Sequence, residues 1–200
     1  MEIVLATRNR RKVEEVIRIM VDLPILILTL DDFPACPETE EDGATFEENA
    51  VKKAITGAKC AGKPSLADDS GLEVYALKGA PGVFSSRYAG PEANDRKNIE
   101  KLLNEMRFLE GKHRKARFVC CIALAFPDGK VHTFYGYTEG LVGTEPRGGS
   151  GFGYDPIFYP EGRDKTFAEM TAEEKDAISH RGRALREVRD FLISRMEKKI

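Results

Sequence analysis

Two adjacent carboxylates, Asp68 and Asp69, are the side chains of this sequence best suited to acid–base or metal chemistry. They follow a short apolar stretch and precede Ser70 and Gly71 in the run S-L-A-D-D-S-G-L-E-V at 65–74. Side chains alternate along a strand, so in an extended segment the two acids face opposite ways. The pattern predicts a buried strand that stops, turns at Gly71 and leaves two acids at the edge of a sheet. The same letters also suit an ordinary turn, because Asp, Ser and Gly favour turns.

A possible anion site lies near the N-terminus. An apolar strand is expected at 2–6, and Val13, Val16, Ile17 and Met20 then repeat at helical spacing. The turn between them, T-R-N-R-R-K at 7–12, brings main-chain N–H groups, the positive end of a helix and Lys12 to one place. The alternative is an ordinary capped helix with a basic, solvated face.

The next segments are a second apolar strand at 23–30, a loop at 31–42 whose acids are mostly solvated, and a helix. Thr45 and Glu48 form a capping box, and Gly62 follows the last turn at about Ala61. The end of this helix imitates a phosphate-binding P-loop, but Pro64 stands where Ser or Thr is needed. We reject the P-loop for that reason.

The second half of the chain contains a glycine-rich loop at 148–156, G-G-S-G-F-G-Y-D-P. It could be a flexible linker, but Phe152 is suited to stack on a nucleotide base and Asp155 to form a hydrogen bond with it. A helix at about 91–108 and a buried central strand at 118–126 precede it, and a hairpin returns through 130–137. Thr171 caps a short helix that contains Lys175, and a final helix opens at 179–182.

Composition limits the class of protein. Two hundred residues, 42% of them hydrophobic, suit one domain with two lobes. A net charge of −2 and a pI near 6.0 argue against a general nucleic-acid binder, and no apolar run approaches the length of a membrane span. The four cysteines have no metal-site spacing and no pattern of a disulfide framework, and the N-terminus has no signal-peptide layout. We therefore expect a cytoplasmic protein with reduced cysteines.

Six motifs, in order over nearly the full length, resemble the inosine triphosphate pyrophosphatase (Ham1-like) family. They are T-R-N-R-R-K at Thr7, F-E-E-N-A at Phe46, L-A-D-D-S-G-L at Leu66, A-P-G-V-F-S-S-R-Y-A-G at Ala80, G-F-G-Y-D-P-I-F at Gly151 and S-H-R-G-R-A-L at Ser179. The resemblance implies an α/β fold over residues 1–200, two-lobed, with a long mixed β-sheet flanked by helices and the active-site cleft between the lobes. It also implies a homodimer and magnesium-dependent hydrolysis of ITP, dITP and XTP to the monophosphate and pyrophosphate.

The resemblance also implies site residues. Phosphates are held by Thr7, Arg8, Asn9, Arg10, Arg11, Lys12 and Lys53. Mg²⁺ is held by Asp69 and Glu40, although Glu41 is an alternative to Glu40. Asp69 is also the proton acceptor, and Ser70 contacts the substrate. The base pocket consists of Phe152, Gly153, Tyr154, Asp155, Lys175, His180 and Arg181.

The chemistry of the bases suggests how ITP is distinguished from ATP. Hypoxanthine carries an acceptor oxygen at C6, where adenine carries a donor amino group. Lys175 and Arg181 can only donate, so a pocket that presents them to C6 favours the first base. Stacking on Phe152 adds affinity for any purine.

Two alternatives stay open. A non-enzymatic nucleotide or RNA-binding module would use the basic cluster at 8–12 and the loop aromatics, although the acidic pI argues against it. A Maf-like pyrophosphatase shares the strand–turn–helix start but prefers other bases. We expect a purine nucleoside triphosphate as the partner, with no nucleic acid and no membrane.

Overall fold

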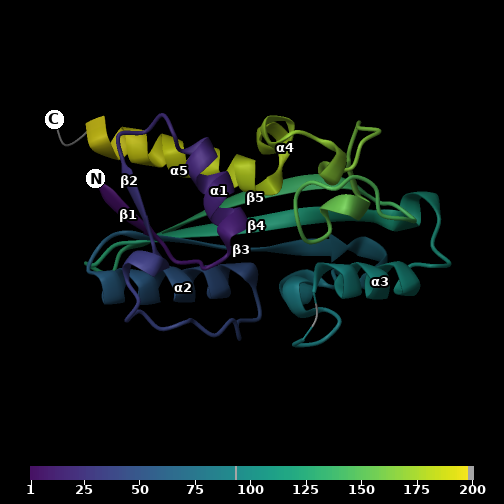
Figure 1. Cartoon of the computed structure of the whole chain (residues 1–200), viewed down its shortest axis with the longest axis horizontal. Coiled ribbons are helices and arrows are strands. Elements are labelled where there is room, and N and C mark those ends of the chain that lie inside the picture. Colours follow the sequence, from purple (N-terminus) through teal and green to yellow (C-terminus); the bar gives the residue numbers. More distant parts are fainter. Residues whose placement is uncertain (93, 198–200) are drawn as a thin grey trace. The chain divides into compact units, whose positions relative to one another are not determined.

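A six-stranded sheet with flanking helices forms the framework of the residues that the computed structural model describes, 1–92 and 94–197 (Figure 1). The sheet order is β2-β1-β3-β4-β5-β6. The strands are β1 (Glu2–Leu5), β2 (Leu26–Thr29), β3 (Ser65–Val74), β4 (Lys115–Ala125), β5 (Val131–Val142) and β6 (Phe158–Pro160). The helices are α1 (Arg10–Ile19), α2 (Phe46–Ala61), α3 (Asp95–Glu105), α4 (Ala172–Ile178) and α5 (His180–Glu197). The predicted mixed α/β fold is confirmed.

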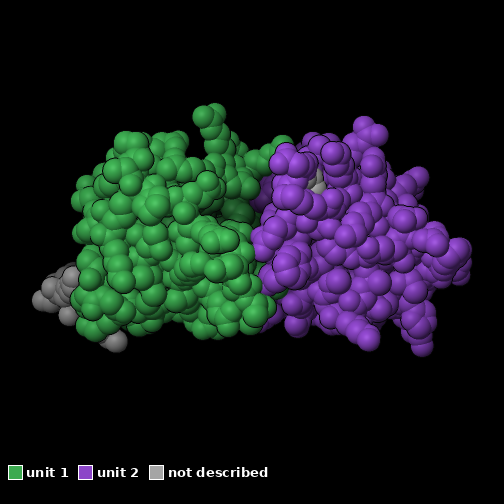
Figure 2. Space-filling model, turned by 90° about the horizontal axis from the view of Figure 1, so that it is seen from below, with its two compact units in different colours: residues 1–69, 120–136, 181–200 green, residues 70–119, 137–180 purple. Residues whose placement is uncertain are grey.

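The chain divides into two compact units (Figure 2). Unit 1 comprises Met1–Asp69, Cys120–Gly136 and the chain from Arg181 onward, and unit 2 comprises Ser70–Val119 and Tyr137–His180. Strands β3, β4 and β5 each contribute residues to both units.

In unit 1, β1 pairs in parallel with β2 on one side and with β3 on the other. Helices α1 and α5 cover one face of these strands and α2 covers the other (Figure 1). Alternation assigns each strand residue to a face: Leu5 and Leu66 pack in one cluster with Val16 of α1 and Leu185 of α5. A Cβ on Gly57 of α2 would collide with the Ser65 hydroxyl, so the glycine permits close packing of this helix.

Strand β3 does not turn at Gly71, and that prediction is wrong. The strand runs without interruption from Ser65 to Val74, through both aspartates. Leu72 and Val74 are fully buried, so the apolar run after Gly71 extends the same strand into a second core. The preference of the D-D-S-G sequence for a turn was overridden because the residues on both sides of it are buried.

Unit 2 has its own core, in which α3 packs its Ile99, Leu102 and Met106 side chains with Phe118 and Phe158. Strands β5 and β6 are antiparallel, with Leu141 opposite Tyr159. Helix α3 begins later than predicted because Asn94 caps it, and it ends at Glu105. Strand β5 extends five residues beyond the predicted end at Tyr137. Helices α2 and α4 begin after the predicted caps, Thr45 and Thr171.

The prediction that the cysteines form no disulfide is wrong. Cys36 and Cys60 are bonded, whereas Cys120 and Cys121 are free and buried, as expected of core residues. The bond joins the loop before α2 to the last turn of α2, an approach that a separation of 24 residues in the sequence does not reveal. No helix in the described part of the chain is long and apolar enough to cross a membrane.

Candidate active site

Asp68 and Asp69 lie in the middle of β3 with their side chains on opposite faces of unit 1, as predicted. Asp68 contacts Lys12 of α1 and Arg181 of α5, whereas Asp69 contacts α2. Both residues are buried, with 7% and 6% of their surface exposed. Each acid therefore has a separate set of partners.

The Asp68 carboxylate is the centre of a buried ion network. Its Oδ2 lies 3.1 Å from Nζ of Lys12 and accepts hydrogen bonds from Nε and Nη2 of Arg181 at 3.2 and 2.9 Å. Nη1 of Arg181 donates to Oε2 of Glu15 at 2.5 Å. Burial opposes ionisation, but Lys12 and Arg181 hold the pKa of Asp68 well below its usual value. Asp68 is therefore ionised at neutral pH and joins β3 to α1 and α5.

Asp69 is held by two residues of α2 that are one helical turn apart. Nδ2 of Asn49 donates to its Oδ2 at 3.1 Å, and Nζ of Lys53 lies 3.3 Å from its Oδ1. Burial raises the pKa of Asp69, Lys53 acts against this and the Glu41 carboxylate adds to it. The pKa values of two neighbouring acids are thus shifted in opposite directions, which is how sites separate a fixed anion from a proton acceptor.

The Lys53 ammonium contacts oxygen atoms of three residues. Its Nζ donates to Oε1 of Glu41 at 2.6 Å and to the main-chain oxygen of Asp68 at 2.7 Å, besides its contact with Asp69. Burial by itself lowers the pKa of Lys53, but the surrounding acids raise it above its usual value. The ammonium group therefore stays charged between the loop and β3.

The turn into α1 is ordered by its own side chains. Oδ1 of Asn9 accepts hydrogen bonds from the main-chain N–H groups of Arg11 and Lys12 at 3.1 and 3.3 Å. Oγ1 of Thr7 accepts one from the N–H of Asn9 at 3.1 Å. The cap expected under the alternative is present, with the carboxamide oxygen of Asn9 at the positive end of the helix, and phosphate binding at this turn stays a prediction.

The basic residues of this turn differ in their surroundings. Arg8, Arg10 and Arg11 are exposed, and Nη1 of Arg8 lies 3.3 Å from Asp31. The side chain of Lys12 is only 15% exposed because it lies against Asp68. The structure therefore brings Lys12 into contact with Asp68 of β3.

The loop between β2 and α2 carries the predicted metal ligand. Glu41 binds Lys53, whereas the Glu40 side chain is exposed. Nζ of Lys52 binds Asp42 at 2.6 Å, which ties the loop to α2 a second time. No group of three or more potential metal ligands of the His, Cys, Asp and Glu types occurs within 1–92 and 94–197.

Unit 2 holds a second cluster, built around Asp155. Oδ2 of Asp155 accepts hydrogen bonds from Nζ of Lys175 at 2.7 Å and from the main-chain N–H of Phe152 at 2.8 Å. The Lys175 ammonium also lies 4.9 Å from the centre of the Phe152 ring. Gly151 has a φ of +73°, and a Cβ there would collide with the Asp155 carboxylate. The loop is therefore an ordered turn, and the linker interpretation is wrong.

Four other predicted site residues differ from one another in burial and in hydrogen-bond partners. His180 is buried and stacks on Phe118 with ring centres 4.5 Å apart. Tyr154 is a core residue whose hydroxyl donates to the main-chain oxygen of Ser85 at 2.9 Å. Gly153 donates its N–H to Asp95 at 2.8 Å, and Ser70 is half-buried directly after Asp69.

Arg181 belongs to unit 1, whereas the residues of the cluster around Asp155 belong to unit 2. All three of its guanidinium nitrogens donate to Asp68 or Glu15. These contacts favour a role in holding Asp68, and base reading by Arg181 stays a prediction.

Sequence reasoning missed Asn49 and Glu15 and gave Glu41 only as an alternative. Asn49 stands inside the F-E-E-N-A motif, four residues before Lys53, so both face the same side of α2. Glu15 follows Lys12 by three residues on α1 and faces the core with it. Both residues could have been found from their spacing, because each is a polar residue three or four positions from a predicted ligand on the same helix.

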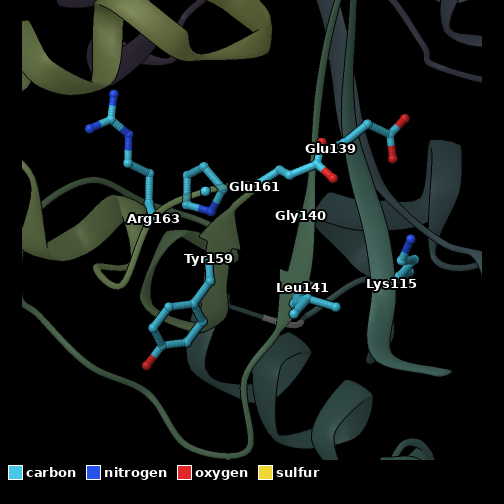
Figure 3. A pocket seen from close by; sticks show the side chains of 9 residues that line it. Lys115, Glu139, Gly140, Leu141, Tyr159, Glu161 and Arg163 are labelled. Carbon is cyan, nitrogen blue, oxygen red and sulfur yellow. The ribbon is translucent and has the colours of Figure 1, made fainter. Parts of the chain in front are cut away.

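A hollow of about 310 Å³ lies elsewhere in unit 2 (Figure 3). Glu139, Gly140 and Leu141 of β5 and Tyr159 of β6 line it, with Lys115 and Arg163. None of the predicted substrate residues is among its lining residues.

Comparison with known proteins gives a consistent result. The sequence model of the Ham1 family matches residues 3–191. A protein of Geobacter sulfurreducens called dITP/XTP pyrophosphatase is 51% identical over 190 residues, covering 95% of this chain and 96% of that protein. One of the same name from Thermus thermophilus is 54% identical over 186 residues, covering 93% and 89%.

Solved structures agree with the sequence matches. A HAM1 protein from Coxiella burnetii superposes with a TM-score of 0.89 at 45% identity, over 97% of this chain and 99% of that one. The Ham1 protein of Staphylococcus aureus gives a TM-score of 0.87 at 42% identity, over 98% and 100%.

Proposed function

This chain belongs to the Ham1 family, and on that premise we propose that it hydrolyses deaminated purine nucleoside triphosphates, dITP and XTP among them, to the monophosphate and pyrophosphate. The observation that carries the proposal is the buried Asp69 carboxylate, whose pKa is raised. Asn49 and Lys53 hold this carboxylate, and the ion pair of Lys12 and Asp68 lies next to it. The site thus combines a proton acceptor with cations for a polyphosphate.

Phosphate binding is assigned to the start of α1 and to two lysines. A triphosphate carries about four negative charges, and in the reaction charge spreads over the phosphoryl oxygens. Lys12, Lys53 and the positive end of α1 place fixed positive charge in unit 1. The exposed Arg8, Arg10 and Arg11 add charge around this turn.

Asp69 is assigned as the proton acceptor for the attacking water. Water must lose a proton as its oxygen bonds to the α-phosphorus and the bond to the pyrophosphate oxygen breaks. A carboxylate whose pKa is raised by burial accepts that proton more readily than an ordinary surface acid. Lys53 and Asn49 hold its two oxygens, which fixes its orientation.

Magnesium is proposed as the cofactor, held by Asp69 and Glu40. The donor set fits a hard cation, because magnesium takes oxygen ligands and usually one or two carboxylates together with substrate phosphates. The oxygens of Glu41, Asp69 and the Asp68 main chain already converge on one positive group, the Lys53 ammonium. When bound, the cation neutralises phosphate charge and polarises the phosphoryl group.

The base is assigned to the cluster in unit 2. The Phe152 ring offers a stacking surface, and the Lys175 ammonium offers a donor that Asp155 holds in place. A fixed donor favours the C6 oxygen of hypoxanthine or xanthine over the C6 amino group of adenine. His180 is buried in the same unit, where it stacks on Phe118.

Cytoplasmic location and a homodimer complete the proposal. Tyr75, Tyr137 and Leu141 of unit 2 are 48%, 40% and 43% exposed, and the Arg117 guanidinium lies 5.2 Å from the Tyr137 ring. Aromatic and arginine side chains are enriched in protein interfaces. Sedimentation of the wild type and of Tyr137→Glu tests the dimer; an unchanged mass for the variant removes this surface from it.

The function is tested with a panel of dITP, XTP, ITP, dATP and dGTP, with pyrophosphate and orthophosphate measured separately. We expect kcat/KM for the deaminated substrates to exceed the others by orders of magnitude, with pyrophosphate as the product. Preference for a different base would favour a Maf-like enzyme. Binding without turnover would favour a nucleotide-binding module.

A further inference from the structure

Asn49 is a buried amide whose two ends bind two different parts of the site. Only 1% of the residue is exposed. Its Nδ2 donates to Oδ2 of Asp69 at 3.1 Å, and its Oδ1 accepts from the main-chain N–H of Gly43 at 2.8 Å. Asn49 therefore links β3 to the loop before α2.

The chemistry of the partners fixes the orientation of this amide. An ionised carboxylate only accepts hydrogen bonds and a main-chain N–H only donates, so the nitrogen of Asn49 must face Asp69 and its oxygen must face Gly43. Among side chains of this length, only a carboxamide has one donor and one acceptor so arranged. Aspartate, leucine and serine each lack part of this pattern.

The loop comes close to α2 at this point because residue 43 is glycine. A Cβ on Gly43 would lie 2.7 Å from Oδ1 of Asn49 and 2.8 Å from Cβ of Glu48. Glu40 and Glu41 precede this contact by three and two residues. The position of Asn49 thus limits where those two carboxylates lie relative to Asp69.

A second side chain of α2 completes the arrangement. Lys53 binds the other oxygen of Asp69 and also binds Glu41, so both Asn49 and Lys53 join the same loop to the same carboxylate. Buried polar groups are hydrogen-bonded in native proteins, so both ends of the Asn49 amide are expected to have partners. Here one partner is the carboxylate to which the catalytic step is assigned.

We propose that Asn49 is a positioning residue: it orients the Asp69 carboxylate and fixes the loop of Glu40 and Glu41 beside it, so that carboxylates from two segments act on one divalent cation. The inference rests on the proposed function for its catalytic consequence. Its metal-binding consequence is measured without nucleotide.

The test compares Asn49→Leu, which keeps the volume but removes both hydrogen bonds, with Asn49→Ala, which leaves space instead. Lys52→Ala is the matched control, since Lys52 lies on the same helix and binds the same loop through Asp42 but does not contact Asp69. Mn²⁺ affinity is measured by electron paramagnetic resonance in the absence of nucleotide. The kcat and KM for dITP are measured separately with magnesium.

We expect both Asn49 variants to weaken Mn²⁺ binding and to lower kcat, each by about ten- to a hundred-fold, the usual effect of losing a residue that orients a metal ligand. KM for dITP should change much less, and Lys52→Ala should match the wild type in every measurement. Circular dichroism confirms folding, and Asn49→Ala decides the matter if Asn49→Leu does not fold.

Wild-type Mn²⁺ affinity and kcat in a folded Asn49 variant would overturn the proposal. Equal losses in Lys52→Ala would also overturn it, because they would show that any tether of the loop has the same effect. If the wild type hydrolyses no triphosphate but the Asn49 variants still lose Mn²⁺ affinity, the proposed function fails and the positioning of the metal site stands.

Discussion

Asp68 and Asp69 are consecutive residues of one strand, but Asp68 binds Lys12 and Arg181 on one face while Asp69 binds Asn49 and Lys53 on the other. Cations lower the pKa of the first acid, whereas burial and the nearby Glu41 carboxylate raise the pKa of the second. The same substitution at the two positions should therefore have different consequences.

Asp69→Asn should lower kcat for dITP by about a hundred- to ten-thousand-fold, the range of general-base catalysis. The amide keeps the shape but accepts no proton and binds a divalent cation poorly. Steady-state kinetics measure the loss, and thermal unfolding serves as the control for folding. Turnover close to that of the wild type would remove Asp69 from the mechanism.

Asp68→Asn should instead lower the free energy of unfolding at pH 7 by about 3 kcal/mol, because Arg181 and Lys12 lose their buried counter-charge. The folded pKa of Asp68 lies below its unfolded value, so its stabilisation is present above the unfolded pKa and is lost as pH falls through the folded one. Urea unfolding from pH 7 to pH 3 should show a constant difference in stability between the variant and the wild type down to about pH 4, and the difference should begin to shrink below that pH.

The control for that experiment is Asp42→Asn, which breaks an exposed pair with Lys52. Exposed pairs contribute little to stability, so its unfolding curve should stay near that of the wild type. Equal destabilisation by both substitutions would contradict the network assigned to Asp68.

Glu40→Gln should weaken Mn²⁺ binding more than Glu41→Gln does. The Glu41 carboxylate lies 2.6 Å from the Lys53 ammonium, closer than the Asp69 carboxylate at 3.3 Å, whereas the Glu40 side chain is exposed. Titration with Mn²⁺ without nucleotide compares the two variants directly. A larger loss of Mn²⁺ affinity with Glu41→Gln would show that the metal ligand is Glu41 and not Glu40.

Lys175→Met should lower kcat/KM for dITP about ten- to a hundred-fold more than that for dATP, because only dITP uses the donor at C6, whereas the lost contact with Asp155 affects both substrates. Phe152→Ala should lower both, since stacking does not distinguish purines. Arg181→Ala provides a third comparison: a collapsed dITP/dATP ratio would assign it to the base, and equal losses would assign it to Asp68 and Glu15.

Cys60→Ser should lower the free energy of unfolding by about 3 kcal/mol, the effect expected for releasing a closed segment of this length. Dithiothreitol should have the same effect on the wild type and none on the variant. If reductant leaves the unfolding curve of the wild type unchanged, Cys36 and Cys60 do not stabilise the protein as a bonded pair.

Local patterns predicted much of this fold. Caps identified the starts of α2 and α4 because Thr45 and Thr171 bond to main-chain N–H groups within three residues. Alternation placed Asp68 and Asp69 on opposite faces because it depends only on strand geometry. The turn expected at Gly71 failed because the tertiary burial of Leu72 and Val74 outweighed the local preference of Asp, Ser and Gly.

Partners from distant segments could not be predicted in the same way. Arg181 binds Asp68 across 113 positions of sequence, and Cys36 meets Cys60 only because the loop folds back along α2. Motif resemblance identified Arg181 as a site residue but not what its guanidinium contacts. Pairing of this kind depends on the packing of α1, α2 and α5 about the strands.

Each lysine that carries a proposed substrate contact already has a carboxylate partner. The pairs are Lys12 with Asp68, Lys53 with Glu41 and Asp69, and Lys175 with Asp155. A triphosphate that binds these lysines therefore has to displace the carboxylates that already contact them. We therefore expect small anions such as chloride or orthophosphate to compete poorly for these lysines, and catalysis to tolerate the salt and phosphate concentrations of a cell.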